Sequence, residues 1–291
     1  MNFKVARIFV VALMISLLFF SCQKDDVIVQ SLYDLSGAPL KYNDSKATRF
    51  LNVAAISIES SKSKTENLEK ITQSIRKITI DEPEVELILF GETILGWYID
   101  DENPLAYQHT VAESVPGPAT DIISQLADSL NIYVAFGMSE SDNGQLYNSQ
   151  VLINPSGEIE AVHRKVNLTP EDLAGGFTEE ARTQANVTVV NINNIRVGMI
   201  VCADVGSYWL TDQLVEQKAE LILHSMASEV PEFAIDPVSR QFNAWEVFAN
   251  RFGPEGDRQY SGTTFIADPS GMVRVSGGKK ETIRTYKIGV R

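Results

Sequence analysis

The chain has 291 residues, of which 44% are hydrophobic and 22% are charged, and its formal net charge is −13. This composition is ordinary for a soluble globular protein with a sizeable core, so no disulfide framework is needed. The acidic balance argues against nucleic acid or an anionic membrane surface as a partner, because both require basic patches.

The N-terminal segment has the pattern of an export signal. Lys4 and Arg7 precede an apolar run over 8–20, and Ser21 and Cys22 follow that run. The run is shorter than the roughly 20 apolar residues of a membrane span. A basic start, a short apolar stretch and a small residue at the end mark a signal peptide.

Residues 18–22, Leu-Phe-Phe-Ser-Cys, resemble the lipobox of bacterial lipoproteins, although two of them are bulkier than usual. The resemblance implies that residues 1–21 are removed and that Cys22 becomes the lipidated first residue. We expect an exported protein that is anchored by this lipid to a bacterial membrane, on the periplasmic or cell-surface side. The alternative is a plain secreted protein.

Residues 22–50 are polar, and we expect them to form a tether to a domain over 51–291. If Cys22 carries the lipid, Cys202 has no partner among the two cysteines and remains a free thiol. A free thiol in an exported protein needs an explanation.

Apolar patterning predicts alternating strands and helices from about residue 52. Helical spacing appears behind Thr65 and again around Ile123. Apolar runs predict buried strands over 53–58, 85–90, 133–137, 187–192, 197–201, 221–224 and 265–267. Two turns with the sequence Pro-Ser-Gly, at 155–157 and 269–271, lie between apolar strands and hint at two similar halves. The pattern predicts an α/β protein with a mixed sheet.

Three residues that follow apolar strands are candidates for catalysis. Cys202 ends a buried strand and enters a turn, a position that favours catalysis in α/β sheets and a reactive thiolate. Glu92 also follows a buried strand, where partial desolvation raises a carboxyl pKa toward that of a useful base. Lys165 follows the strand after the first Pro-Ser-Gly turn. Taken singly, these are a core cysteine, a loop glutamate and a surface lysine.

Together the three contexts resemble the nitrilase superfamily of carbon–nitrogen hydrolases. Its typical blocks occur here in order, as Phe90-Gly91-Glu92, then Arg164-Lys165, then Cys202-Ala203-Asp204. Further blocks agree, at 146–149 with 154–157, at 218–223, and at 249–253 with 261–271. The resemblance covers about residues 52–290.

The resemblance implies a four-layer α-β-β-α sandwich, with two mixed sheets packed face to face. It implies a nucleophile at Cys202, a base at Glu92, an oxyanion partner at Lys165 and a second glutamate, Glu140, that orients the lysine. The backbone N–H of Ala203 is expected to stabilise the oxyanion as well. Four residues are expected to line the substrate pocket, namely Tyr98, Asp204, Ser207 and Tyr208.

No metal and no organic cofactor is expected. His109, His163 and His224 lack metal-ligand spacing and are interpreted as structural or surface residues. The segment 173–177, with paired glycines, is either a mobile lid or a surface loop. A homodimer is expected from the family resemblance. The chain lacks the longer C-terminal tail that relatives often use at subunit contacts, so this expectation rests on the resemblance alone.

The expected reaction is hydrolysis of an amide or nitrile of a small molecule through a cysteine thioester. One alternative is an N-acyltransferase, which passes the acyl group to an amine. The other is a lipid-anchored binding protein without turnover. After Asp204 many relatives carry an aromatic residue, Pro and Glu, whereas this chain reads Val-Gly-Ser-Tyr-Trp over 205–209. That difference leaves the substrate open.

Overall fold

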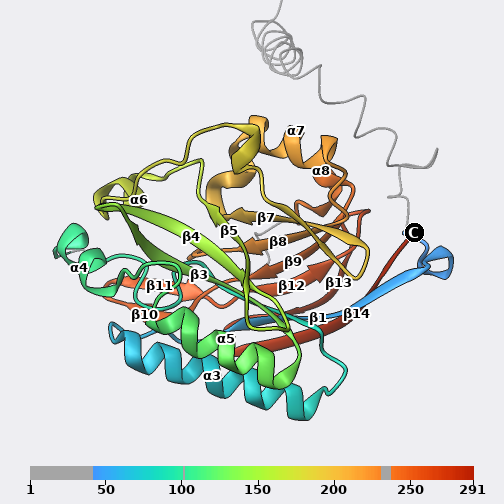
Figure 1. Ribbon diagram of the computed structural model, residues 1–291, viewed down its shortest axis with the longest axis horizontal. Coiled ribbons are helices and arrows are strands. Elements are labelled where there is room, and N and C mark those ends of the chain that lie inside the picture. Colours follow the sequence, from blue (N-terminus) through green and yellow to red (C-terminus); the bar gives the residue numbers. More distant parts are fainter. Residues whose placement is uncertain (1–41, 101, 231–236) are drawn as a thin grey trace, which may run out of the picture. The chain divides into compact units, whose positions relative to one another are not determined.

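Two six-stranded β-sheets form the centre of the protein in the computed structural model (Figure 1), which describes residues 42–100, 102–230 and 237–291. The sheets belong to a unit that runs from Asn43 to Arg291. The signal peptide and Cys22 lie outside the described residues.

The first sheet has the strand order β14-β1-β2-β3-β4-β5. Its central strands β1, β2 and β3 are parallel, and the antiparallel hairpin β4–β5 and the antiparallel strand β14 complete its two sides. The bounds of the strands are β1 Arg49–Ser57, β2 Leu87–Phe90, β3 Tyr133–Asp142, β4 Gln145–Ile153, β5 Ile159–Arg164 and β14 Thr282–Val290.

The second sheet repeats this plan with the order β13-β12-β9-β8-β7-β6. Strands β7, β8 and β9 are parallel, and β12–β13 and β6 are antiparallel to their neighbours. The bounds are β6 Val189–Ile192, β7 Ile195–Val201, β8 Leu221–Ser225, β9 Trp245–Ala249, β12 Thr264–Ala267 and β13 Val273–Gly277. The two Pro-Ser-Gly turns connect β4 to β5 and β12 to β13, which are equivalent hairpins. The hint of two similar halves is confirmed.

Helices cover the outer faces of both sheets. On the first sheet lie α3 (Lys64–Asp81) and α5 (Pro118–Leu130), and on the second lie α7 (Tyr208–Glu216) and α8 (Ser239–Phe242). Figure 1 shows α3 and α5 side by side below the first sheet. The predicted four-layer α-β-β-α arrangement is confirmed.

The helix α3 shows why these segments fold as they do. Ile71, Ile75 and Ile78 recur at helical spacing and are buried against the first sheet. The N-cap of the helix is Ser63, two residues before Thr65, because the Ser63 side chain accepts a hydrogen bond from the N–H of Glu66.

Alternation along the strands supplies a second apolar layer between the sheets. Ile88 and Phe90 belong to the cluster under α3 and α5, so Leu87 and Leu89, which are also fully buried, face the other sheet. A chain of hydrogen bonds crosses this interface. Gln150 Nε2 donates to Ser225 Oγ (2.6 Å), and Ser225 Oγ donates to the carbonyl oxygen of Phe90 (2.8 Å).

The ordered unit begins earlier than predicted. The tether was expected to extend to residue 50, but residues 43–50 belong to the unit. A short 3-10 helix, η1 (Asp44–Lys46), precedes β1, and Thr48 N donates to the carbonyl oxygen of Val290 (2.9 Å). The β14 strand near the C-terminus therefore holds this segment.

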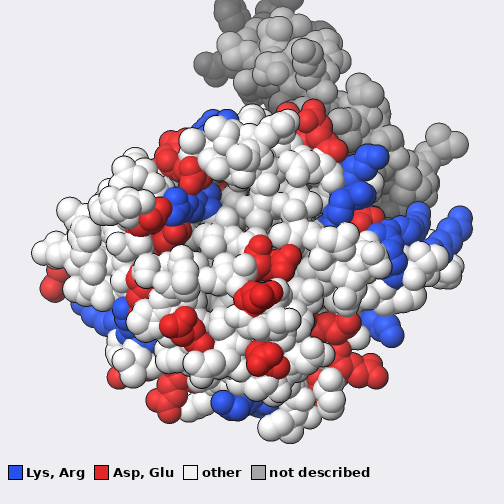
Figure 2. All heavy atoms as spheres, viewed as in Figure 1, with Lys and Arg blue, Asp and Glu red and all other residues white. Residues whose placement is uncertain are grey.

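Acidic side chains are scattered over the face shown in Figure 2, and the basic ones stand in small groups nearer its edges. Within the described ranges, no helix is both long enough and apolar enough to cross a bilayer.

Candidate active site

Each of the three predicted site residues follows the end of a strand, two in the first sheet and one in the second. Glu92 follows β2 in the loop 91–98, Lys165 follows β5, and Cys202 is the first residue of the 3-10 helix η3 (Cys202–Gly206) after β7. The carboxyl ends of parallel strands meet at one edge of a sheet, so the fold gathers these side chains.

Lys165 is enclosed between two carboxylates. Its Nζ donates to Glu92 Oε1 (2.7 Å) and to Asp172 Oδ2 (2.7 Å), and all three side chains have no exposed surface. An ammonium group has three N–H donors, so one donor remains for another acceptor. Burial would lower the pKa of Lys165, but the charges of Glu92 and the neighbouring acidic groups outweigh it and raise that pKa well above its usual value.

Asp172 is a site residue that the sequence analysis missed. It lies in the short helix α6 (Pro170–Ala174), where Thr169 is the N-cap and shares a capping box with it. Asp172 Oδ2 accepts from the N–H of Thr169 (2.8 Å) as well as from Lys165. The sequence signal was the Thr-Pro-Glu-Asp start, which predicts a helix beginning rather than chemistry.

Glu140 does not orient the lysine, contrary to the expectation. Its carboxylate accepts from Ser149 Oγ (2.6 Å) and forms an ion pair with the guanidinium of Arg164 (2.5 Å). Glu140 lies near the end of β3, paired with Tyr147 of β4, and this register directs it toward Arg164. Asp172 contacts Lys165 in its place.

Asn148 and Tyr98 connect the two carboxylates. Asn148 Nδ2 donates to both Glu92 Oε1 (2.7 Å) and Asp172 Oδ1 (2.9 Å). The Tyr98 hydroxyl donates to Asp172 Oδ1 (3.0 Å). Burial raises the pKa of Tyr98 well above its usual value, so this hydroxyl remains a donor. Tyr98 was expected only as a pocket residue, and it also supports Asp172.

Glu92 is a buried carboxylate with one oxygen that has no partner among the described residues. Oε1 accepts from Lys165 and Asn148, whereas Oε2 is buried and has no partner among the described residues. Burial raises the pKa of Glu92; the charge of Lys165 opposes this and the charge of Asp172 adds to it. Oε2 is therefore the free acceptor on this carboxylate.

Cys202 is partly buried and has a left-handed backbone, with a φ of 49°. Such a φ is uncommon for a residue other than glycine and is found at strained functional positions. Burial and the charge of Glu92 raise the pKa of the thiol well above its usual value. The resting group is therefore a thiol beside a carboxylate.

Asp204 fixes the turn after Cys202 to the segment after Lys165. Its Oδ1 accepts from the N–H groups of Val166 (2.9 Å) and Asn167 (3.0 Å). Its Oδ2 accepts from the N–H of Val201 (2.9 Å) and lies 2.8 Å from His163 Nε2. Asp204 is fully buried, as are Glu92 and Lys165, and its expected role as a pocket residue stays a prediction.

The other predicted residues around Cys202 differ in exposure. Ala203 lies in η3, directly after Cys202, and its carbonyl oxygen accepts from Asn167 Nδ2 (2.5 Å). Ser207 is buried, and its hydroxyl has no partner within the described part of the chain. Tyr208 is 75% exposed at the start of α7. The expected pocket roles of Ser207 and Tyr208 stay predictions.

A buried ion pair holds the loop that carries Glu92. The Arg251 guanidinium donates to the carbonyl oxygens of Glu92 (2.7 Å) and Thr93 (2.9 Å). It also pairs with Glu255, whose Oε2 accepts from the N–H of Tyr98 (2.7 Å). Thr93 has a φ of 43°, so the pair stabilises a left-handed residue next to the base. Neither Arg251 nor Glu255 was expected at the site from the sequence.

The segment 173–177 is anchored rather than a free surface loop. Phe177 is buried, and its neighbour Thr178 donates from its N–H to the carbonyl oxygen of Leu146 (2.7 Å). Its motion as a lid stays a prediction. Within the described ranges, no group of three His, Cys, Asp or Glu side chains is arranged to hold a metal ion.

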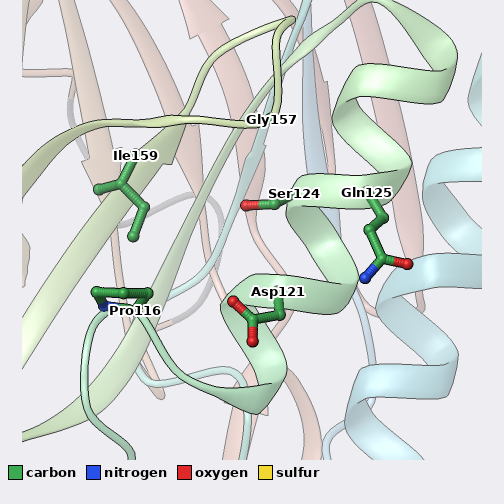
Figure 3. A pocket seen from close by; sticks show the side chains of 6 residues that line it. All are labelled: Pro116, Asp121, Ser124, Gln125, Gly157 and Ile159. Atoms are coloured by element: carbon green, nitrogen blue, oxygen red, sulfur yellow. The ribbon is translucent and has the colours of Figure 1, made fainter.

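A separate hollow lies between α5 and the β4–β5 hairpin (Figure 3). It is lined by Pro116, Asp121, Ser124, Gln125, Gly157 and Ile159. None of these is a residue of the cluster around Cys202, so this hollow is distinct from the candidate active site.

Known proteins share this sequence pattern and fold. An (R)-stereoselective amidase from a Pseudomonas species is 25% identical over 75% of this chain and 78% of its own. An omega-amidase from Xenopus laevis is 25% identical over 62% of this chain and 70% of its own. The crystal structure of an amidase from a Nesterenkonia species has a TM-score of 0.72 at 17% identity, covering 85% of this chain and 94% of that one.

The family model for carbon-nitrogen hydrolases matches residues 52–289. This range contains both sheets except the first three residues of β1 and the last residue of β14, and it contains every residue of the cluster around Lys165. The chain belongs to the carbon-nitrogen hydrolase family, the nitrilase superfamily.

Proposed function

We propose that the protein hydrolyses the amide bond of a small molecule through a thioester on Cys202. The observation that carries this proposal is the buried cluster in which Lys165 joins Glu92 and Asp172 beside the thiol. A base, a cationic donor and a nucleophile are the three groups that acyl transfer requires.

The first half of the reaction forms the thioester. Because the resting group is a thiol, Glu92 takes the Sγ proton as Cys202 attacks the amide carbon. The remaining N–H of Lys165 and the N–H of Ala203 stabilise the oxyanion of the tetrahedral intermediate. When the intermediate collapses, the C–N bond breaks, and the proton on Glu92 passes to the departing nitrogen as ammonia or an amine leaves.

The second half returns the enzyme to its starting state. Glu92 takes a proton from a water molecule, and the resulting hydroxide attacks the thioester carbon. The C–S bond then breaks, the sulfur recovers the proton from Glu92, and the carboxylic acid leaves. No redox step is involved, so the cycle balances with one water consumed for each amide cleaved.

Similar proteins support an amide rather than a nitrile as the substrate. The curated relatives named above are amidases, and a mutant of the Nesterenkonia amidase was solved in complex with butyramide. Short aliphatic amides are therefore the first class to test. Transfer of the acyl group to an amine instead of water would give the N-acyltransferase alternative, and product analysis with an added amine separates the two.

The test compares the two cysteines of the chain. Purified protein is screened for ammonia release across a panel of amides, and the acyl-enzyme is sought by intact mass after a short reaction. We expect Cys202→Ala to abolish both signals and Cys22→Ser, the matched control, to retain them. Full activity in Cys202→Ala would refute the thioester scheme. Amide binding without ammonia release and without an acyl-enzyme would favour a binding protein instead.

We also propose that Cys22 carries a lipid that anchors the protein to a bacterial membrane on its exported side. The lipobox-like sequence supports this, and residues 22–42 leave length for a tether before the unit. Partition into detergent should be lost in Cys22→Ser, whereas a wild-type protein that stays in the aqueous phase would contradict the anchor. A homodimer stays a prediction that sedimentation can test.

A further inference from the structure

His224 lies near the end of β8, beside the strand that carries the nucleophile. Its ring is 2% exposed and packs edge-on against the ring of Phe248, with 5.0 Å between the ring centres. Nδ1 lies 2.9 Å from Glu246 Oε1, and Nε2 lies 3.3 Å from the carbonyl oxygen of Cys202. The reaction scheme above gives this buried pair no role.

The partners of the ring indicate that it carries two protons. The Cys202 carbonyl can only accept a hydrogen bond, so Nε2 must donate. Glu246 Oε2 accepts from the N–H groups of Val238 (2.7 Å) and Ser239 (3.0 Å), and such bonds favour the charged carboxylate. Nδ1 then donates to Glu246 Oε1. A ring that donates from both nitrogens is an imidazolium, and the carboxylate of Glu246 would pair with its buried charge.

The carbonyl that His224 contacts belongs to the same peptide group as the N–H of Ala203. The C=O and N–H of a peptide are conjugated, so a cation at the oxygen draws electron density from the nitrogen. Hydrogen bonds in such a chain polarise one another, and the N–H becomes a stronger donor. The direction of this peptide is set by the left-handed φ of Cys202. The carbonyl of the next peptide group, that of Ala203, accepts a hydrogen bond from Asn167 Nδ2.

We propose that His224 is a charged positioning residue that polarises the Cys202–Ala203 peptide and strengthens its N–H as an oxyanion donor. The proposal rests on the proposed function, in which that N–H contacts the oxyanion. An oxyanion exists only in the transition state and the tetrahedral intermediate. The effect should therefore appear in kcat and leave substrate binding unchanged.

The protonation of His224 can be measured without a substrate. The chain has three histidines, so a protein labelled with ¹⁵N-histidine gives few ring signals, and His224→Gln assigns those of His224. We expect both ring nitrogens of His224 to carry protons at neutral pH. A ring with one unprotonated nitrogen would overturn the proposal.

The effect on the oxyanion is measured with two ligands, the best amide substrate and an aldehyde analogue of that amide. Glutamine at 224 can still donate to the carbonyl but carries no charge. Loss of a whole oxyanion donor costs roughly 100–1000-fold in rate, so loss of its polarisation should cost less, about tenfold in kcat. The KM for the best amide should stay within about twofold. Affinity for the aldehyde analogue, which forms an oxyanion on Cys202, should fall by the same factor as kcat.

Phe248→Leu is the matched control, because it removes packing against the same ring and keeps the charge pair. We expect it to lower the melting temperature without the selective loss of aldehyde affinity. If His224→Gln changes kcat no more than Phe248→Leu does, the proposal is wrong. If the wild-type protein shows no Cys202-dependent amide hydrolysis, the proposed function fails, and this inference fails with it.

Discussion

Lys165 shows how single residues set the chemistry of this site. Its cation lies without solvent between Glu92 and Asp172, so the cluster carries one net negative charge when both acids are ionised. Removing charges from water is expensive, and an unpaired buried charge costs several kcal/mol. Burial and the charge of Asp172 raise the pKa of Glu92, so this carboxylate takes up a proton more readily than an exposed one.

The raised pKa of Glu92 predicts the acid limb of the pH profile. Glu92 must be ionised to take the thiol proton. We therefore expect kcat/KM to increase as the pH rises through the pKa of Glu92 and to be low at pH values below that pKa. Because burial raises this pKa, the midpoint should lie above the ordinary value of 4.5. The measurement is kcat/KM against pH for the best amide. A limb centred at or below 4.5 would contradict the assignment of Glu92 as the base.

Asp172→Asn tests the second carboxylate. Asparagine keeps the size of the side chain but removes the charge that opposes ionisation of Glu92, so the acid limb should move to lower pH. The loss of a contact that orients Lys165 should also lower kcat, by about 10–100-fold. The neighbouring substitution Glu171→Gln, on the same helix, is the control and should leave both unchanged. If the acid limb does not shift in Asp172→Asn, the charge of Asp172 has no effect on the pKa of Glu92.

Sequence reasoning found the residues that occupy strand ends and missed those that depend on a loop. Glu92, Lys165 and Cys202 each follow an apolar run, and their spacing matched a family pattern. Asp172 reaches Lys165 only because Thr169 starts a helix that turns back toward it. Glu140 was assigned to the lysine by resemblance alone, and the register of β3 with β4 directs it to Arg164 instead.

At the scale of elements, the loop 91–98 is placed by close backbone contacts. Gly137 of β3 faces this loop, and a Cβ there would lie 2.4 Å from the Thr93 nitrogen and 2.6 Å from Glu92 Cα. Both are backbone atoms, so the loop rather than a flexible side chain would have to move. The ion pair of Arg251 and Glu255 resists that movement from the other side.

We therefore expect Gly137→Ala to reduce kcat by about 100-fold, since a displacement of about 1 Å at a reacting group has that effect. Gly144→Ala is the control in the turn of the same hairpin, where a Cβ meets no atom within 4 Å. Its positive φ of 79° makes alanine strained, so it should lower stability without lowering kcat. Equal activities in the two variants would show that the loop tolerates displacement.

Long periodic elements were predictable, and short ones were not. The helices α3 and α5 and the parallel strands β1, β2, β3, β7 and β8 were expected from their apolar patterns, whereas the parallel strand β9 was not. The short helices α4 (Pro104–Val111), α6 and α8 were not, since few turns leave little periodicity. Strand β14 was missed because five of its nine residues are only partly buried or exposed, so it lacks a continuous apolar run. The small sheet of β10 (Phe252–Glu255) and β11 (Arg258–Ser261) was missed as well.

For the whole molecule, the sandwich depends on contacts between the two sheets, and one of them is ionic. Glu220 precedes β8 of the second sheet and forms an ion pair with Arg49 of β1 in the first (2.8 Å). The N–H of Arg196 in β7 also donates to Glu220 (3.1 Å). The two similar halves could be expected from the sequence, but this connection between them could not, because it joins residues 171 positions apart.

Glu220→Gln should therefore weaken the unit in a pH-dependent way. Burial alone would raise the pKa of Glu220, but hydrogen bonds from Arg49 and Arg196 and their positive charges lower it. A carboxylate with a lowered pKa contributes stability above its unfolded pKa, and that contribution is lost as the pH falls through the lower folded value. The carboxylate is partly exposed, so the expected loss in unfolding free energy at pH 7 is about 1 kcal/mol.

Urea titrations at pH 7 and near pH 3 measure this loss, with Glu216→Gln on the exposed side of α7 as the control. Because glutamine cannot ionise, the difference between wild type and Glu220→Gln should shrink toward zero at the lower pH, and a difference that is the same at both values would assign the effect to packing rather than to charge.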